Sequence, residues 1–195
     1  IEEVCKKCPS ATQIFITCYE NNPVFLPMLK DNLERIRKKV RHDYGAKLYV
    51  TVYEENYLTD SKNHYTVSLF DETREDKFDL IICNPPLDLI DKYSPEAEAV
   101  GKVTQLKTAA AYLFCRLAAK HLEDGGQLVI MLPTTASTSA GLAPFRKEMA
   151  NALSLRKIHL FVGKQKNQKR AVPLKKSFIL AYAKAEKTDT IDVTT

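Results

Sequence analysis

Apolar residues along this chain occur with two different periods, and these periods predict where strands and helices lie. Short runs rich in β-branched and aromatic residues predict strands, whereas apolar residues three and four positions apart predict helices. The predicted strands are QIFITCYE (13–20), a strand within AKLYVTVYEENYL (46–58), FDLIICN (78–84), QLVIMLP (127–133), SLRKIHLFVG (154–163) and KKSFILAYAKA (175–185). The predicted helices are the end of one at 1–8, one at 23–40, one within 103–126 that stops at two glycines, and one at 143–153.

Strands and helices alternate along most of this pattern, and the last two strands form an antiparallel pair. This order predicts an α/β fold with a mostly parallel sheet, an antiparallel edge strand and helices on both faces. The length of 195 residues and the hydrophobic share of 45% suit one sizeable core, so we expect a single domain over residues 1–195. The opening IEEVCKKC resembles the end of a helix, which predicts that the chain is part of a longer protein.

Charge and cysteine content narrow the class of protein. The net charge of +5 and the pI near 8.8 suit a polyanionic partner without requiring one. Cys18, Cys83 and Cys115 lie in apolar runs, where buried free thiols are expected, and this favours a reducing, cytoplasmic setting. No run approaches the roughly 18 apolar residues of a membrane span, so we expect a soluble protein. Cys5 and Cys8 have CxxC spacing but lack a second pair of ligands, so no metal site is predicted.

The run FDLIICN ends in two prolines, and this is an unusual end for a buried strand. Proline removes a backbone donor and keeps the residue before it out of the helical region, so the chain leaves the sheet in an extended form. The side chain of Asn84 and the carbonyl of Pro85 should therefore lie at the carboxyl end of a strand, where open α/β sheets bind their ligands. The alternative is that Asn-Pro-Pro only terminates the strand.

Two further strand ends carry polar residues of a kind that binds nucleosides. Glu20 ends the first predicted strand, and a carboxylate at such a place commonly accepts hydrogen bonds from both ribose hydroxyls. Asn22 and Pro23 also form a helix cap and a first-turn proline, and this interpretation is compatible with the first. Asn56 follows the next strand with Tyr57 beside it; a polar strand end without a ligand is the alternative there.

These motifs resemble those of the S-adenosylmethionine-dependent methyltransferases that act on amino nitrogens, whose signature is (Asn/Asp/Ser)-Pro-Pro-aromatic after the fourth strand. NPPL at 84–87 matches three of its four places. The stretch from VGKVTQLK to SLRKIHLF resembles, more narrowly, the restriction–modification adenine-N6 methyltransferases, and the likeness extends from Glu3 to about Lys184. It implies a Rossmann-like class I methyltransferase sheet.

The resemblance also implies roles for individual residues. Asn84 and the carbonyl of Pro85 would accept the two hydrogens of the target amino group, with Pro86 and Leu87 completing the catalytic motif. The cofactor S-adenosylmethionine would be bound by Asn84 and by the residues after the first two strands, Glu20, Asn21, Asn56 and Tyr57. The reaction would be transfer of a methyl group to N6 of adenine in DNA.

The chain departs from this pattern at several places. Asn22 and Asn56 stand where the family has acidic residues, and Leu87 stands where an aromatic ring would stack on the base, for which Tyr93 is a candidate replacement. The glycine-rich loop that holds the methionine part of the cofactor has no counterpart, and the target-recognition segment is also missing. The resemblance therefore implies a partial catalytic domain, inactive alone, from a protein that works with a restriction nuclease subunit or a fused nuclease domain.

Basic side chains near the motif are candidates for phosphate contacts. Lys92 and Lys102 lie between NPPL and the next helix, and a basic loop precedes the last strand with Lys164, Lys166, Lys169 and Arg170. Most such charge runs are simply solvated, which is the alternative here. Two rival functions remain: methylation of a protein glutamine or an RNA guanine-N2 by the same Asn-Pro-Pro device, and a degenerate domain that binds DNA without catalysis.

Overall fold

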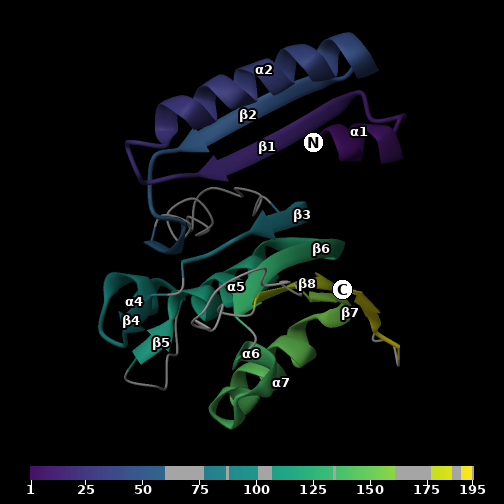
Figure 1. Cartoon of the computed structure of the whole chain (residues 1–195). Helices are drawn as coiled ribbons and strands as arrows, with labels where there is room; N and C mark the ends of the chain where they lie inside the picture. The colour runs from purple at the N-terminus through teal and green to yellow at the C-terminus, as the bar shows by residue number, and fades with distance from the viewer. Residues whose placement is uncertain are drawn as a thin grey trace, which may run out of the picture. The chain divides into compact units, whose positions relative to one another are not determined.

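The computed structural model describes residues 1–59, 77–86, 88–100, 107–133, 135–160, 177–185 and 190–194. The chain separates into two compact units, unit 1 with residues 1–61 and unit 2 with residues 62–195. Figure 1 labels their helices and strands. Each unit is described by itself.

Unit 1 is a two-stranded parallel sheet with one long helix on it. Its elements are α1 (Glu2–Lys7), β1 (Gln13–Tyr19), α2 (Leu26–Tyr44) and β2 (Lys47–Tyr53). The two strands pair in register from Gln13 opposite Lys47 to Tyr19 opposite Tyr53. Figure 1 shows α2 running along both strands, as a helix that crosses between parallel strands must. The helix ends at Gly45, whose φ of 65° lies in the left-handed region that glycine adopts readily.

The core of unit 1 is small and lies under α2. Val40 of the helix and Leu48 of β2 are buried there with Cys5 and Ala46. The side chains of the strands alternate, so the opposite face of the sheet carries Phe15 and Tyr49, which stack with ring centroids 4.9 Å apart. This face remains exposed, which leaves the unit with one buried face only.

Unit 2 contains the larger sheet. Its elements are β3 (Phe78–Cys83), β4 (Leu89–Asp91), α4 (Pro95–Val100), β5 (Lys107–Ala109), α5 (Ala110–His121), β6 (Leu122–Pro133), α6 (Thr135–Thr138), η1 (Ala140–Leu142), α7 (Ala143–Ala152), β7 (Ser154–Leu160), β8 (Ser177–Ala183) and β9 (Asp192–Thr194). Five strands form one sheet in the order β3-β6-β8-β7-β9, while β4 and β5 form a separate antiparallel pair. The predicted helix at 103–126 is observed as α5 and ends at His121, because buried Leu122 already begins β6.

The sheet of unit 2 is mostly parallel, as predicted. β3 is parallel to β6 and β7 is parallel to β9, whereas β8 is antiparallel to both of its neighbours. The antiparallel strand was expected at the edge, but it lies inside the sheet between β6 and β7. Leu180 and Tyr182 of β8 are buried there, as suits an inner strand.

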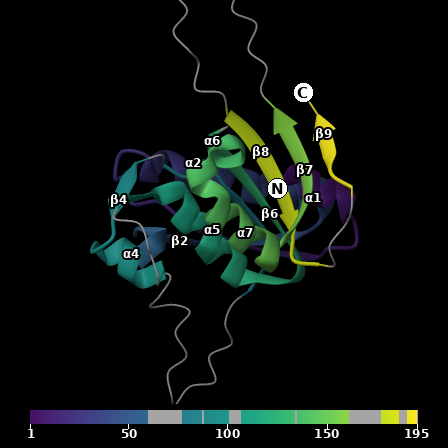
Figure 2. The same ribbon diagram turned by 90° about the horizontal axis from the view of Figure 1, so that it is seen from below.

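The core of unit 2 lies between this sheet and two helices. Leu128, Ile130 and Leu132 alternate along β6 and are almost completely buried. α5 contributes Cys115 and α7 contributes Met149 to the same cluster. Figure 2 shows both helices over β6 and β8. Helices were expected on both faces of the sheet, but the helices of the described part of unit 2 that pack into its core share one face.

Candidate active site

The Asn-Pro-Pro motif follows β3, as predicted from its prolines. Alternate residues of β3 pack against the core of unit 2, and Ile81 and Cys83 are among them. Asn84 is exposed, Pro85 is buried and Pro86 is exposed, so the asparagine projects from a proline that is anchored in the protein. Leu87 lies outside the described residues.

The polar groups of this motif are not used by the described structure. No described residue hydrogen-bonds to the side-chain amide of Asn84, and no described backbone N–H donates to the carbonyl of Pro85. Both are oxygen acceptors, and an amino group needs two acceptors for its two hydrogens. The motif therefore presents a pair of acceptors that suits a planar NH₂ group.

The nearest thiols are unsuited to act as nucleophiles. Burial raises the pKa of Cys83, which directly precedes Asn84, to about 12. Burial also raises the pKa of Cys115 well above its ordinary value, with a smaller effect from Cys83. Since the thiolate is the reactive form, both sulfur atoms are chemically inert at neutral pH. Reaction chemistry at this strand end would therefore depend on hydrogen bonding. All five cysteines are free thiols, and of the three expected to be buried, Cys115 is buried whereas Cys18 and Cys83 are partly buried.

The segment after the motif is tied to the start of α5. The carbonyl of Asp88 accepts a hydrogen bond from the N–H of Ala110 at 2.8 Å. β4 and β5 then pair from Leu89 opposite Ala109 to Asp91 opposite Lys107. Figure 1 shows β4, α4 and β5 gathered together where the chain leaves β3. Residues 88–91 are therefore connected by backbone hydrogen bonds to β5 and to the start of α5.

In unit 1, Glu20 follows β1 and its carboxylate is held in place. Its N–H donates to the carbonyl of Tyr53 at 3.0 Å, and its Oε1 accepts the N–H of Asn22 at 2.7 Å. No described cation forms an ion pair with this half-buried carboxylate. Asn22 in turn accepts the N–H of Val24 through Oδ1 at 3.0 Å. Asn22 was expected to cap a helix with Pro23 in its first turn, but α2 begins at Leu26, with Phe25 as its N-cap and Pro27 in its first turn. Asn22 instead closes the turn that precedes the helix, because its side chain bonds the backbone two residues on, and its own N–H orients Glu20.

Asn56 and Tyr57 follow β2 in the same unit. Oδ1 of Asn56 accepts the N–H of Leu58 at 3.0 Å, so this side chain caps the helical turn at 57–59. The ring of Tyr57 meets Tyr19 edge-on, with centroids 5.1 Å apart, and Tyr19 stacks on Tyr53 at 4.9 Å. Asn21 is exposed. The assignment of these residues to a cofactor stays a prediction.

Only one of the predicted phosphate contacts lies among the described residues. Lys92 is half-buried, and its ammonium nitrogen lies 5.6 Å from the ring centroid of Tyr93. The other candidates are outside the described residues: Lys102, Lys164, Lys166, Lys169 and Arg170. Of the predicted phosphate contacts, the structure therefore describes only Lys92.

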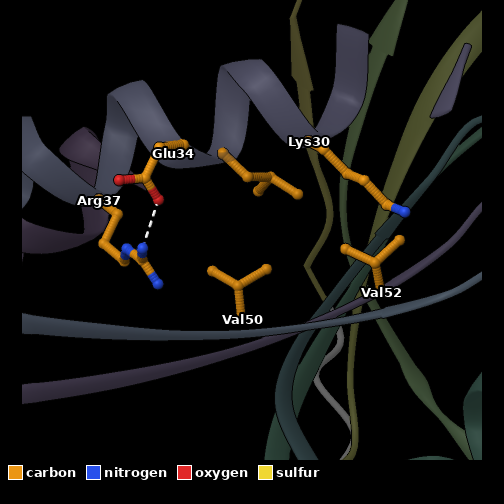
Figure 3. Close-up of a pocket in the computed structure, with 6 residues that line it drawn as sticks. Lys30, Glu34, Arg37, Val50 and Val52 are labelled. Carbon is orange, nitrogen blue, oxygen red and sulfur yellow. Dashed lines mark ion pairs between the residues drawn. The ribbon is translucent and has the colours of Figure 1, made fainter. Parts of the chain in front are cut away.

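A small pocket between α2 and β2 was not predicted. It has a volume of about 120 Å³ and is lined by Lys30, Leu33, Glu34, Arg37, Val50 and Val52. Figure 3 shows an apolar floor beneath the ion pair of Glu34 and Arg37, whose nitrogen and oxygen lie 2.5 Å apart. Ligand pockets usually measure about 300–1,000 Å³, so this one is too small for a nucleoside. Its residues come from separate elements, so no local motif signals it.

The described residues contain neither a candidate metal cluster nor a helix that could span a membrane. No cluster of three or more histidine, cysteine, aspartate or glutamate side chains that could hold a metal ion occurs among these residues. Among the same residues, no helix has the length and apolar character needed to cross a bilayer.

The fold is that of the class I S-adenosylmethionine-dependent methyltransferases. A putative enzyme of that class from Listeria monocytogenes superposes with a TM-score of 0.56 at 12% sequence identity, over 97% of this chain and 60% of that one. The model of the Eco57I restriction-modification methylase family matches residues 12–167, and the chain belongs to this family. The type II methyltransferase M.PstI of Providencia stuartii is 26% identical over 176 residues, which are 90% of this chain. The chain spans about a third of that relative's length, 34%.

Proposed function

We propose that this chain carries catalytic residues of an S-adenosylmethionine-dependent methyltransferase that modifies N6 of adenine in DNA. The observation that carries the proposal is the exposed Asn84 at the end of β3, whose amide and neighbouring Pro85 carbonyl are unused by the described residues. The family match supports action on DNA, because its description names restriction–modification methylases. The two oxygen acceptors, of Asn84 and Pro85, support an exocyclic amino group as the target.

The chemistry assigned to Asn84 requires no strong base. Its Oδ1 and the Pro85 carbonyl accept the two hydrogens of the adenine amino group, which draws the nitrogen lone pair out of conjugation with the ring. S-adenosylmethionine supplies, when bound, the electrophilic methyl group. Asn84 and Pro85 hold the amino nitrogen in line for attack, so the rate gain comes from position and hydrogen bonding. The target base must leave the duplex for this, because its amino group is otherwise paired.

The residues of unit 1 fit the adenosine part of the cofactor. Glu20 has one carboxylate oxygen engaged by the N–H of Asn22, and a carboxylate accepts several hydrogen bonds at once. It can therefore receive both ribose hydroxyls while its orientation is maintained. Asn56, with Asn21 and Tyr57 beside the same strand ends, completes the proposed cofactor set together with Asn84.

A restriction nuclease, as a separate subunit or a fused domain, is the partner proposed from the family description. The free thiols suit a reducing compartment, which supports a cytoplasmic location.

The test is transfer of a tritiated methyl group from S-adenosylmethionine by the naturally encoded protein. DNA, RNA and protein acceptors are offered separately, and labelled DNA is digested to nucleosides to identify the product. Labelled N6-methyl-2′-deoxyadenosine from DNA is the expected result. Label in glutamine or in guanine of RNA would replace the proposal with the corresponding rival reaction. DNA binding without any transfer would support the degenerate domain.

A further inference from the structure

The turn after β4 presents an aromatic ring that the described structure leaves uncovered. Tyr93 is 79% exposed, the largest value among the large apolar side chains of the described residues. Single exposed apolar residues are common on protein surfaces, so this exposure alone indicates no function. Two further observations bear on a function for this ring: the hydrogen bonds of the backbone around Tyr93 and the cation beside its ring.

The ring is attached to a rigid turn. The N–H of Tyr93 donates to Oδ1 of Asp91 at 2.9 Å, and the N–H of Ser94 donates to the Asp91 carbonyl at 3.1 Å. Ser94 then caps α4, because its Oγ accepts the N–H of Ala97 at 3.2 Å. Hydrogen bonds on both sides therefore fix the backbone of Tyr93, which reduces the conformational entropy lost when its ring binds a partner.

The turn itself makes no structural use of the ring. A large apolar residue before a helix cap commonly packs on the fourth helical residue, and that residue here is the exposed Glu98. A carboxylate offers no apolar surface for such packing. The neighbour that the ring does have is a cation, since the ammonium nitrogen of Lys92 lies 5.6 Å from its centroid.

A rigid, exposed ring beside a cation has the two features that a nucleotide requires. Nucleobases stack on aromatic side chains, and a basic side chain attracts the adjoining phosphate. Tyr93 also follows β4, a strand that pairs with β5 and lies just after Asp88, whose carbonyl is bonded to the start of α5. The structure assigns Tyr93 as the stacking surface for the base whose amino group meets Asn84, with Lys92 at its phosphate; this inference rests on the proposed function.

The test uses the naturally encoded protein and a single-stranded oligothymidine that carries one 2-aminopurine, whose fluorescence falls when it stacks. Wild type and Tyr93→Phe should quench the probe alike, whereas Tyr93→Ala should bind it about 5- to 100-fold more weakly and leave it bright. Leu89→Ala is the matched control, because Leu89 is 66% exposed on the adjacent β4. It should behave as wild type.

A second readout separates this inference from the proposed function. On DNA whose methylated site has been mapped, Tyr93→Ala should raise KM by a similar factor. Methylation by Tyr93→Ala within twofold of wild type, with unchanged quenching, would overturn the stacking role and leave the proposed function intact. An equal loss in Leu89→Ala would also overturn it. A third outcome separates the two claims. If the wild-type protein methylates no DNA, but quenches the probe and only Tyr93→Ala fails to do so, the proposed reaction is refuted and the stacking surface is still supported.

Discussion

The two compact units differ most in how completely each one buries its sheet. Unit 1 covers one face of β1 and β2 with α2 and leaves Phe15 on the other face 73% exposed. Unit 2 packs α5 and α7 on a five-stranded sheet, and the side chains of Leu128 and Ile130 have no exposed surface. Two-stranded sheets are marginally stable, whereas wider sheets packed against helices are independently stable. The contribution of buried apolar surface to stability should therefore come mainly from unit 2.

The candidate site residues differ in the same way. The acceptor pair of Asn84 and Pro85 follows a strand whose inner residues pack into the large core, so its position is supported by many contacts. Glu20 and Asn56 follow strands of the smaller unit, and their side chains are oriented by hydrogen bonds to backbone groups two residues away. The predicted target-binding residues, Asn84 and Pro85, are thus positioned by the packing of a large core. The side chains predicted to bind the cofactor are oriented by hydrogen bonds within turns.

The largest effect is expected from Asn84→Ala. Loss of one of the two acceptors for the target amino group should lower methyl transfer by 100-fold or more, on the scale of a lost transition-state donor. Affinity for S-adenosylmethionine should change little if Glu20 supplies most of it. Transfer is measured with tritiated cofactor and affinity by calorimetry. Asn151→Ala, at an exposed position of α7, is the control. Turnover of Asn84→Ala close to wild type would remove Asn84 from the reaction.

Core substitutions compare the two units directly. Ile130→Ala in unit 2 should destabilise the protein by about 3–5 kcal/mol, because a tightly packed sheet leaves a cavity behind. Leu48→Ala in unit 1 should cost about 2 kcal/mol, since the thinner core can relax around the deletion. Urea denaturation followed by circular dichroism measures both. Equal costs would show that the two cores are equally constrained.

His121 makes unit 2 sensitive to acid. Burial, with a smaller effect from Lys120, lowers its pKa to about 4, whereas an unfolded histidine titrates near 6.5. As the pH falls from about 6.5 to 4, the unfolded state takes up the proton first, so stability decreases by up to about 3 kcal/mol. His121→Gln should flatten this part of the stability profile in denaturation series at several pH values. An unchanged slope in the variant would refute the assignment.

The smallest effect is expected from Glu20→Gln in unit 1. The amide keeps one oxygen for the N–H of Asn22 but loses the charge and one acceptor, so the dissociation constant for S-adenosylmethionine should rise about tenfold. Glu54→Gln is the control, because Glu54 ends the same sheet and pairs with Lys30 on the surface. Calorimetry on the naturally encoded protein measures both. A similar loss in the two variants would indicate a general charge effect.

Much of this molecule follows from local sequence. The period of apolar residues predicted the strands at 13–20 and 78–84 and the helix at 143–153, because burial of one face demands that period. β3 ends at Cys83, one residue before the predicted end at Asn84, and the two prolines that follow were expected to stop it because proline lacks the donor for a strand ladder. The predicted helix cap at Asn22 was wrong, because α2 begins at Leu26 and the side chain of Asn22 closes the preceding turn instead.

Long-range packing decided the rest. β8 lies between β6 and β7, and no local pattern in the sequence states which strands will be its neighbours. The neutral state of Cys83 and the lowered pKa of His121 arise from the side chains that surround them after folding. The availability of Asn84 is likewise a tertiary property: the sequence determined that an asparagine ends this strand, and the structure decided that no described group consumes its hydrogen bonds, because hydrogen-bond partners are settled by distance in space.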